Sequence, residues 1–164
     1  MIDTDKIYNI IIALLNSSGA KYKLFEHRAA LTYDDLEAVQ KKAGFFGTEG
    51  KCMIIKVDDK FVVYVTTFGY RINFNLIKNK LEAGKIRLAS PDELKEYFGA
   101  EPGCAYPFGF DESIDIFVDP KIYEVEWFLF SPLYPTKTIQ VKGTDLKKVF
   151  KNCANKTGEI SFNF

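Results

Sequence analysis

The sequence predicts a mixed α/β (α+β) fold, in which helices pack around a mixed, partly antiparallel sheet. The chain has 164 residues and is 47% hydrophobic, which is enough to fill a core. Two β-rich runs in its first half are joined by a short polar turn. Helical segments interrupt the other strands at uneven intervals, which does not suit a regular βαβ alternation. We expect a single domain spanning residues 1–164.

The first part of the chain is predicted to form two helices around a short strand. Apolar residues recur at helical spacing over residues 4–17, and Asp3 or Thr4 can cap this helix. A strand is expected at residues 23–26. Thr32, followed three positions later by an acidic residue, is typical of an N-cap and predicts that a second helix begins there.

A β-hairpin is predicted next. The runs Lys51–Val57 and Phe61–Thr67 are rich in β-branched and aromatic residues, and the turn-like triplet Asp58-Asp59-Lys60 joins them. The second run is apolar at successive positions, so both of its faces should be covered. We therefore expect it to be a central strand.

Helix signals and strands alternate unevenly through the rest of the chain. Ser90-Pro91-Asp92-Glu93 combines a capping serine, a proline at the first helical position and a glutamate at the third, which predicts a helix start. Other helices are expected from about Phe74 and over Thr144–Phe150. The remaining strands are expected near residues 86–88, 114–118, 125–130, 136–141 and 159–162.

Charge and cysteine content limit the classes of function. Lys and Arg number 22, as do Asp and Glu, so a broad electrostatic grip on a nucleic-acid backbone is not expected, although a local basic strip is compatible. Cys52, Cys104 and Cys153 are widely spaced, which favours free thiols in a reducing compartment. We find no signal-peptide pattern, and the apolar run at residues 10–15 is too short to span a bilayer. We expect a cytosolic protein without a membrane partner.

The segment Gly103-Cys104-Ala105-Tyr106-Pro107 is the first candidate for a functional site. Glycine permits a positive φ and close approach of a ligand, whereas proline locks φ and lacks an N–H group. Amides left between them can face outward, toward a carbonyl or phosphate oxygen. A purely structural turn remains the alternative interpretation.

Three side chains are further candidates. Lys51 begins a strand face that is otherwise apolar, so its ammonium must either reach water or meet an anion. His27 is the only histidine, and no nucleophile or metal-binding motif accompanies it, so we expect a supporting role without general-base or metal catalysis. Cys104 has no neighbouring lysine or histidine to lower its pKa, so we interpret it as a small residue that contacts substrate and not as a nucleophile.

Several short motifs occur together in a distinctive order. They are Glu26-His27, Thr32, Gly50-Lys51-Cys52-Met53-Ile54-Ile55-Lys56, Leu88-Ala89-Ser90-Pro91-Asp92-Glu93-Leu94, Gly99, Gly103, Pro107-Phe108-Gly109 and Val118-Asp119. From about Lys21 to about Phe150 the chain thus resembles the YbaK/ProX-type aminoacyl-tRNA editing domains, the deacylase family associated with prolyl-tRNA synthetase. The resemblance implies a bent, barrel-like and largely antiparallel sheet.

The resemblance also implies an activity, which is hydrolysis of a small amino acid mischarged on tRNA by a protein acting in trans. Lys51 is then expected to hold the terminal adenosine, while backbone amides of Gly103–Pro107 grip the aminoacyl end and the substrate's ribose hydroxyl assists a bound water. No cofactor or metal is implied. The partners implied are the acceptor end of aminoacyl-tRNA and, as an open alternative, a synthetase. The remaining residues expected to contact substrate are His27, Thr32, Cys52, Met53, Phe108, Gly109 and Ser131.

The chain departs from the family pattern in three places. Ser131-Pro132-Leu133-Tyr134-Pro135 replaces a small glycine-containing turn, Cys52 replaces a threonine or serine, and Phe68-Gly69-Tyr70-Arg71 replaces a polar turn. The two prolines are expected to stiffen and narrow one edge of the pocket. The departures keep two alternatives open, which are a catalytically silent module that binds tRNA or a synthetase, and a domain that binds a nucleotide-like ligand without hydrolysis.

Four lysines also have two interpretations. They could form basic strips for the tRNA stem or be ordinary solvated helix faces, and the second interpretation is favoured. They are Lys41, Lys42, Lys78 and Lys80. The sequence does not indicate the oligomeric state.

Overall fold

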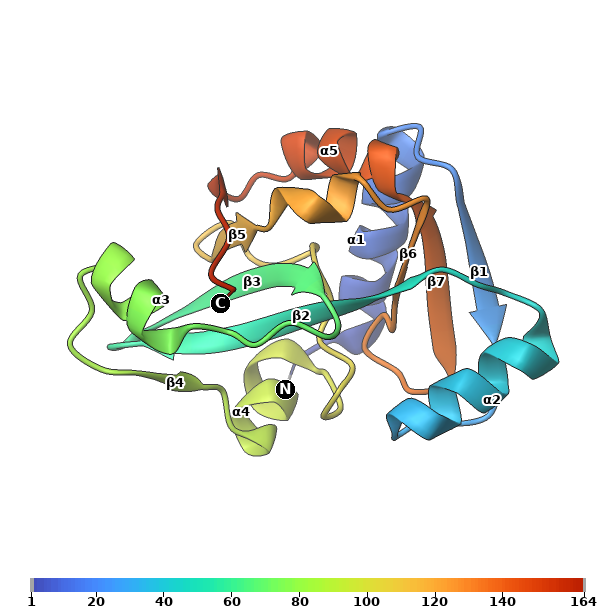
Figure 1. Ribbon diagram of the computed structural model, residues 1–164, viewed down its shortest axis with the longest axis horizontal. Coiled ribbons are helices and arrows are strands. Elements are labelled where there is room, and N and C mark those ends of the chain that lie inside the picture. The colour runs from blue at the N-terminus through green and yellow to red at the C-terminus, as the bar shows by residue number, and fades with distance from the viewer. Residues whose placement is uncertain (1, 164) are drawn as a thin grey trace.

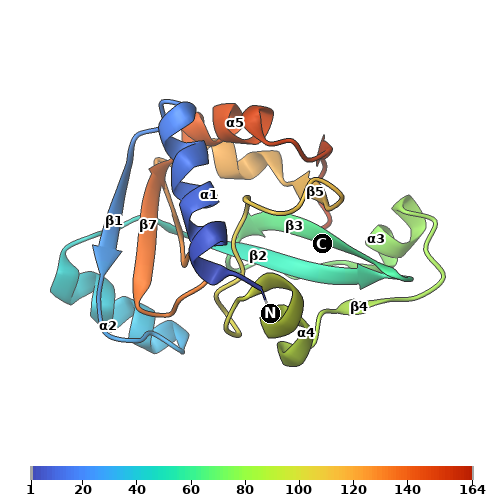
Figure 2. The same cartoon turned by 180° about the vertical axis from the view of Figure 1, so that it is seen from behind.

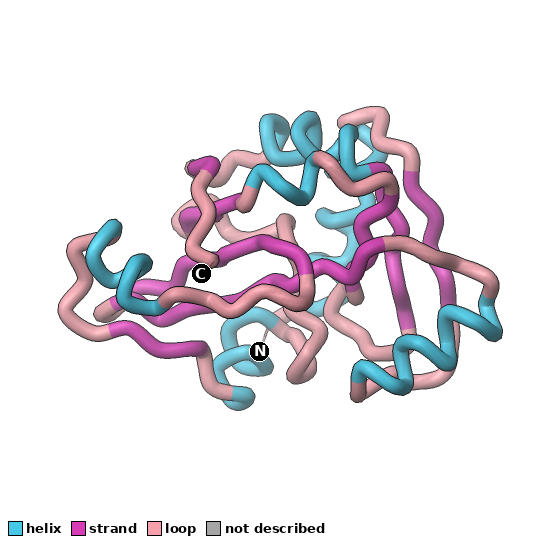
Figure 3. The backbone as a smooth tube through the Cα atoms, in the orientation of Figure 1, coloured by secondary structure: helices cyan, strands magenta, loops and turns pink. Residues whose placement is uncertain are grey.

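Figures 1 and 3 show the fold of the computed structural model, which describes residues 2–163. The helices are α1 (Thr4–Ser17), α2 (Tyr33–Ala43), α3 (Phe74–Lys80), α4 (Pro91–Phe98), the 3₁₀ helix η1 (Pro120–Tyr123) and α5 (Gly143–Asn152). The strands are β1 (Tyr22–Glu26), β2 (Thr48–Val57), β3 (Lys60–Thr67), β4 (Ile86–Leu88), β5 (Asp115–Val118), β6 (Trp127–Phe130), β7 (Lys137–Lys142) and β8 (Thr157–Glu159). The predicted mixed α/β class is confirmed.

The strands form one mixed, eight-stranded sheet in the order β1-β7-β6-β2-β3-β5-β8, with β4 paired to the outer side of β2. Four pairings are antiparallel (β1–β7, β6–β7, β2–β3 and β2–β4) and three are parallel (β2–β6, β3–β5 and β5–β8). In Figure 1 the group β1, β6 and β7 runs crosswise to β2 and β3, so the sheet is strongly bent. Strand β2 takes part in both halves of the bent sheet, because it pairs with β6 in one half and with β3 in the other.

The bend lies where β2 changes partners. Thr48 and Glu49 pair in parallel with β6, and from Gly50 onward the strand pairs antiparallel with β3. Gly50 is required here by close packing, because a Cβ atom at this position would overlap Cζ of the Phe128 ring. Real carbon atoms do not approach so closely, so a side chain at residue 50 would force the strand or the ring to move.

Helices α1 and α2 pack on opposite faces of the sheet. Helix α1, seen in front of the sheet in Figure 2, buries Ile7, Ile11 and Leu15 in the main hydrophobic cluster. On the opposite side, α2 inserts Val39 into a small cluster with Leu129 of β6. The N-caps predicted for both helices are confirmed, because the side chains of Asp3 and Thr32 accept hydrogen bonds from the amides of Lys6 and Asp35.

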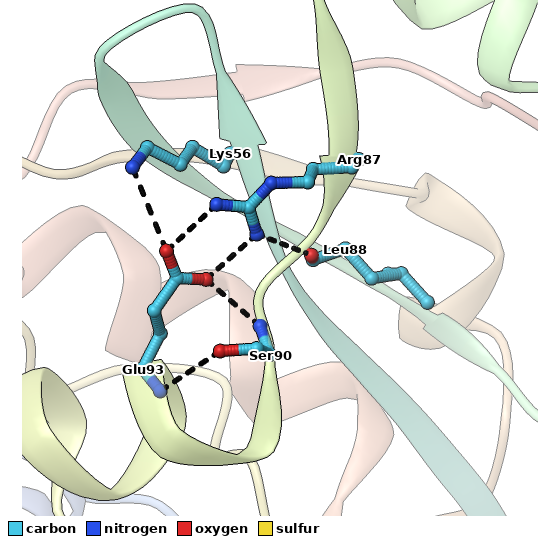
Figure 4. Close-up of polar contacts among 5 residues, drawn as sticks. All are labelled: Lys56, Arg87, Leu88, Ser90 and Glu93. Atoms are coloured by element: carbon cyan, nitrogen blue, oxygen red, sulfur yellow. Dashed lines mark hydrogen bonds and ion pairs between the residues drawn. The ribbon is translucent and has the colours of Figure 1, made fainter.

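A network centred on Glu93 fixes the start of α4 (Figure 4). The predicted capping box is present, since Ser90 Oγ accepts from the amide of Glu93, while Glu93 Oε2 accepts from the amide of Ser90. The same carboxylate accepts two hydrogen bonds from Arg87 of β4, at 2.7 and 2.8 Å, and lies 3.5 Å from the ammonium of Lys56. The Arg87 guanidinium and the Ser90 amide hold the pKa of Glu93 well below its usual value.

The end of the described chain is held by side chains and by isolated backbone contacts, and not by a continuous strand ladder. Asp119 is fully buried, and its carboxylate accepts from the Thr66 hydroxyl at 2.8 Å and the Asn163 amide at 2.9 Å. The backbone N–H of Phe162 donates to the Tyr64 hydroxyl. The strand predicted at residues 159–162 is therefore wrong in its bounds, because β8 ends at Glu159.

The other elements agree with the sequence predictions, apart from two strand starts. Strand β2 begins at Thr48 and not at Lys51, because its pairing with β6 precedes the hairpin. Strand β6 begins at Trp127 and not at residue 125, where η1 and its C-cap come just before it. As predicted, β3 is central, lying between β2 and β5 with both faces buried. Among residues 2–163, no helix combines the length and apolarity needed to cross a membrane.

Replacing Gly50 with alanine is expected to destabilise the fold. The added methyl group overlaps the Phe128 ring, and overpacking of this kind costs about 1–3 kcal/mol. Gly158→Ala is the matched control, because a Cβ atom there would make only ordinary contact with Phe117 at 3.4 Å. Thermal unfolding measures both variants, and equal melting temperatures for the two would contradict the packing argument.

The Glu93 network is expected to make stability depend on pH. The folded pKa lies below the usual value of 4.5, so the contribution is complete above about pH 4.5 and is lost as the pH falls below it. We expect Glu93→Gln to lower the free energy of unfolding at pH 7 and to reduce its further loss on acidification to pH 3. Chemical denaturation at both pH values measures this, with Glu96→Gln, an exposed position on the same helix, as control. Parallel losses of stability in wild type and Glu93→Gln would exclude the network as the source.

Candidate functional site

A cavity of about 380 Å³ opens beside the bend in β2. Its walls come from the N-terminus of α2, from β2, from the loop that follows α4, and from the end of β6. The lining residues are Ala30, Leu31, Thr32, Tyr33, Leu36, Glu49, Gly50, Lys51, Cys52, Met53, Ile54, Phe68, Leu88, Ala89, Leu94, Pro102, Gly103, Ala105, Phe130 and Ser131. Most of this surface is apolar, with a few polar side chains placed among it, as is usual for small-ligand sites.

Lys51 brings a positive charge to the cavity. It lies opposite Thr66 in the β2–β3 ladder, and its side chain is half-buried. No ion pair with Lys51 is present among residues 2–163. The sequence predicted that this ammonium reaches water or meets an anion, and the cavity is a place where an anionic ligand group can reach it.

The loop after α4 presents backbone to the same cavity. Gly103 has a φ of +82°, and a Cβ atom built on it would meet no atom within 4 Å. The amide of Cys104 donates to Glu101 O at 2.9 Å, which closes the turn. The amides of Gly103 and Ala105 donate to no acceptor within the described residues. These two N–H groups are available to a carbonyl or phosphate oxygen.

The other half of the predicted loop faces the core, which corrects part of the sequence prediction. Tyr106 is buried, donates its hydroxyl hydrogen to Phe98 O, and stacks on Phe110 with ring centroids 4.4 Å apart. Pro107 is also buried and does not line the cavity. Gly103 and Ala105 line the cavity, while Cys104 and Tyr106 are buried and anchor the loop.

Phe108 and Gly109 lie still deeper and are not in the cavity wall. The Phe108 ring is fully buried and packs edge-on against Phe130 and Phe150. Gly109 has a φ of +104°, and a Cβ atom there would lie 2.8 Å from Ile11 of α1. Their predicted contact with substrate is therefore not supported. Phe108 supports the cavity only indirectly, through Phe130.

Cys104 is placed where it can neither attack nor contact a ligand in the cavity. Its side chain is 2% exposed and is absent from the cavity lining. Burial raises the pKa of its thiol to about 11, so the thiol is protonated at neutral pH. The interpretation that it contacts substrate is not supported, whereas a covalent mechanism lacks the thiolate it needs.

His27 lies outside the cavity, which corrects its predicted place in the pocket wall. Its Nδ1 lies 2.7 Å from the carbonyl oxygen of Arg28, and its Nε2 lies 2.7 Å from Oγ1 of Thr138. A carbonyl only accepts, so Nδ1 carries a hydrogen, and in the neutral ring Nε2 then accepts from the threonine hydroxyl. The ring is held between β1 and β7 near a separate surface hollow that α2 borders.

Four other predicted residues do line the cavity, and they are Thr32, Cys52, Met53 and Ser131. The unusual turn that begins at Ser131 does not close it. Leu133, with a φ of +71°, is fully buried in the main cluster, and Tyr134 packs near the Tyr8 ring. Of the turn, only Ser131 lines the cavity, so the expected narrowing of the edge is not seen.

Sequence reasoning missed two features of the cavity. One is Glu49, which burial leaves with a pKa raised to about 7. It lies two residues before Lys51 on the same strand face, and placing the strand start at Lys51 hid it. The other is a pair of half-exposed rings at the mouth, Tyr33 and Phe68, which stack with centroids 4.6 Å apart. They come from distant segments, so no local pattern could pair them.

Comparisons with known proteins agree with this geometry. Residues 32–149 match the aminoacyl-tRNA editing domain family. A proline–tRNA ligase of Bacillus licheniformis is 35% identical over 88 residues, which is 51% of this chain and 15% of the ligase. One from Bacillus cereus is 29% identical over 119 residues, which is 70% of this chain and 20% of the ligase. The chain therefore corresponds to at most about a fifth of the length of these ligases.

Solved structures show the same fold at low identity. A crystal structure described as a proposed trans-editing enzyme for prolyl-tRNA synthetase superposes with a TM-score of 0.70 at 14% identity, covering 93% of this chain and 95% of that one. Another, of a protein described only as hypothetical, gives a TM-score of 0.72 at 16% identity, covering 92% and 97%. The family match includes the cavity from Thr32 to Ser131, so the chain belongs to the YbaK-type aminoacyl-tRNA editing domains.

Proposed function

We propose that this protein hydrolyses the ester that joins a small, mischarged amino acid to tRNA, and that it does so in trans. The observation that carries the proposal is that one cavity is lined by Lys51 and by Gly103 and Ala105, whose amides have no acceptor among the described residues. Membership of the editing-domain family supports the substrate class. The trans arrangement is supported by the likeness to a proposed trans-editing enzyme.

The chemistry needs little machinery, because an aminoacyl ester is already activated. The ester carbonyl oxygen accepts from the amides of Gly103 and Ala105, which stabilise the negative charge that develops there as water attacks the carbonyl carbon. The ester C–O bond then breaks, and the departing ribose oxygen takes a proton, with the neighbouring ribose hydroxyl assisting. One such donor is worth about 3–4 kcal/mol of transition-state stabilisation, so two amides alone make a useful catalyst.

Lys51 binds the nucleotide part of the substrate in this proposal. A lysine ammonium is a compact point charge that suits phosphate or ribose oxygens of the terminal adenosine. Met53 follows it on the same strand face, while Cys52 and Ala105 bring short side chains to the wall. Such a pocket favours small acyl groups, which a synthetase separates from its cognate amino acid by only about 1–3 kcal/mol per methylene.

The stacked rings at the mouth offer a place for an unpaired base. Tyr33 is 49% and Phe68 51% exposed, and the two rings stack beside the cavity, an arrangement that resembles the aromatic platforms on which bases of single-stranded nucleic acid stack. Leu31, 71% exposed, extends the same apolar rim. The 3′ end of tRNA is single-stranded, so its terminal bases can stack there while the ester enters the cavity.

The alternative is a silent module that binds tRNA or a synthetase. It was favoured by the Ser131–Pro135 turn, which was expected to narrow the pocket. The turn instead buries Leu133 in the core and leaves the cavity open. This removes the main structural reason for preferring the module, and the proposal of an enzyme is retained.

Lys51→Ala is expected to lower kcat/KM for deacylation by about 10- to 100-fold, because a charge-assisted contact worth about 1.5–3 kcal/mol is lost. The measurement uses purified protein and a panel of tRNAs charged with small amino acids. Lys23→Ala, which removes an exposed strand lysine outside the cavity, is the matched control and should behave as wild type. Wild-type protein that binds tRNA but clears none of the panel would favour the module.

Phe68→Ala is expected to raise KM for aminoacyl-tRNA by about 5- to 100-fold with little change in kcat, because base stacking is worth about 1–3 kcal/mol and lies away from the ester. Phe46→Ala is the control, since Phe46 is 61% exposed and does not line the cavity. Steady-state kinetics separates the two constants. Equal KM values for both variants would rule out the stacking platform.

A further inference from the structure

Glu49 is an ionisable group in the cavity that the mechanism above does not use. Its Oε2 atom is buried and has no hydrogen-bond partner among the described residues. Its backbone is held on both sides, because it pairs with Leu129 of β6 and its carbonyl accepts from the amide of Phe68 at 2.8 Å. The backbone of Glu49 is thus fixed at the cavity wall, and its side chain carries an unsatisfied acceptor.

No positive charge of the described protein compensates this carboxylate. None of the ion pairs among residues 2–163 includes Glu49, and burial is the sole cause that raises its pKa. Lys51 is two residues away on the strand but is not within ion-pair distance. A buried carboxylate without a partner is costly, and native proteins keep such groups mainly where function requires them.

The other groups around the cavity do not satisfy Glu49 either. The titratable side chains that line it are Tyr33 from α2 together with Lys51 and Cys52 from β2. The loop after α4, β4, α4 and the end of β6 contribute none to the lining. The charge of Glu49 acts on Cys52, adding to burial in raising the pKa of that thiol. No described side chain of the cavity wall supplies the missing partner, and a ligand in the cavity can supply it.

We infer that Glu49 binds the α-ammonium group of the aminoacyl ester, and so selects aminoacyl groups from acyl groups that lack an amine. The inference rests on the proposed function and adds a specificity-determining residue to it. In an aminoacyl ester the ammonium is attached one carbon from the carbonyl, so a carbonyl held at Gly103 and Ala105 carries a cation into the same cavity. A neutral hydroxyl could fill the hydrogen bond of Oε2 but could not balance its charge.

The first test compares alanyl-tRNA with lactyl-tRNA, in which a hydroxyl replaces the ammonium and nothing else changes. Each rate is divided by the uncatalysed rate of the same ester. Wild type is expected to favour the alanyl ester, and Glu49→Gln to reduce that preference by about 10- to 100-fold while the lactyl rate changes little. Glu37→Gln, the same change at an exposed position of α2 outside the cavity, should keep the wild-type ratio.

The second test does not require hydrolysis. Stable 3′-amide analogues of alanyl-adenosine and lactyl-adenosine are titrated into each protein by calorimetry. Wild type should bind the alanyl analogue more tightly, and its affinity should fall as the pH drops below about 7, because Glu49 then becomes neutral. Glu49→Gln should bind both analogues alike and lose this fall. The variant is expected to fold, since it removes a buried charge without changing the side-chain volume.

These outcomes separate the inference from the proposed function. If wild type hydrolyses neither ester but binds the alanyl analogue through Glu49, the proposed function fails and the inference stands. If Glu49→Gln slows both esters equally, Glu49 serves the reaction itself, for example as a base, and the inference is wrong. An unchanged alanyl-to-lactyl preference in Glu49→Gln, in either assay, also overturns it.

Discussion

The site depends on one steric constraint, which is the passage of β2 from one half of the sheet to the other. The strand pairs with β6 up to Glu49 and with β3 from Gly50 onward, and the Phe128 ring fills the space that a side chain at Gly50 would need. The cavity lies beside this bend, and the residues on either side of Gly50 line it. Glu49 and Lys51 therefore reach one cavity from a single stretch of backbone.

The cavity combines apolar walls with a few polar groups that the protein leaves without partners. Two amides of the loop after α4 and one oxygen of Glu49 have no hydrogen-bond partner among the described residues, while Lys51 has no ion pair among them. Each of these groups raises the free energy of the folded protein while it lacks a partner. Each can also bind a ligand strongly, since electrostatic contacts strengthen as water is excluded. The buried Tyr106 and the hydrogen bond from the Cys104 amide to Glu101 O hold the loop that carries these amides, so little reorganisation is needed on binding.

Most elements followed from local patterns, and the failures have a common origin. Caps at Asp3, Thr32 and Ser90 act within one helical turn, so the sequence displays them directly. The predicted bounds of β2 and β8 were wrong because distant partners set them, which are β6 for one and β5 for the other. Hydrogen bonds between remote segments leave no periodic trace in the chain.

The sequence by itself determined the mixed α/β class, the hairpin and the family, and it predicted two parts of the cavity wall, Lys51 and the loop that begins at Gly103. Only the tertiary structure decided which side chains share the cavity. In the structure His27, Cys104 and Phe108 lie outside the cavity wall. Glu49 and the stacked rings of Tyr33 and Phe68, which the sequence did not predict as site residues, line it. The physical reason is that composition and spacing specify which face of an element a residue occupies, whereas burial and hydrogen-bond partners depend on which other elements cover that face.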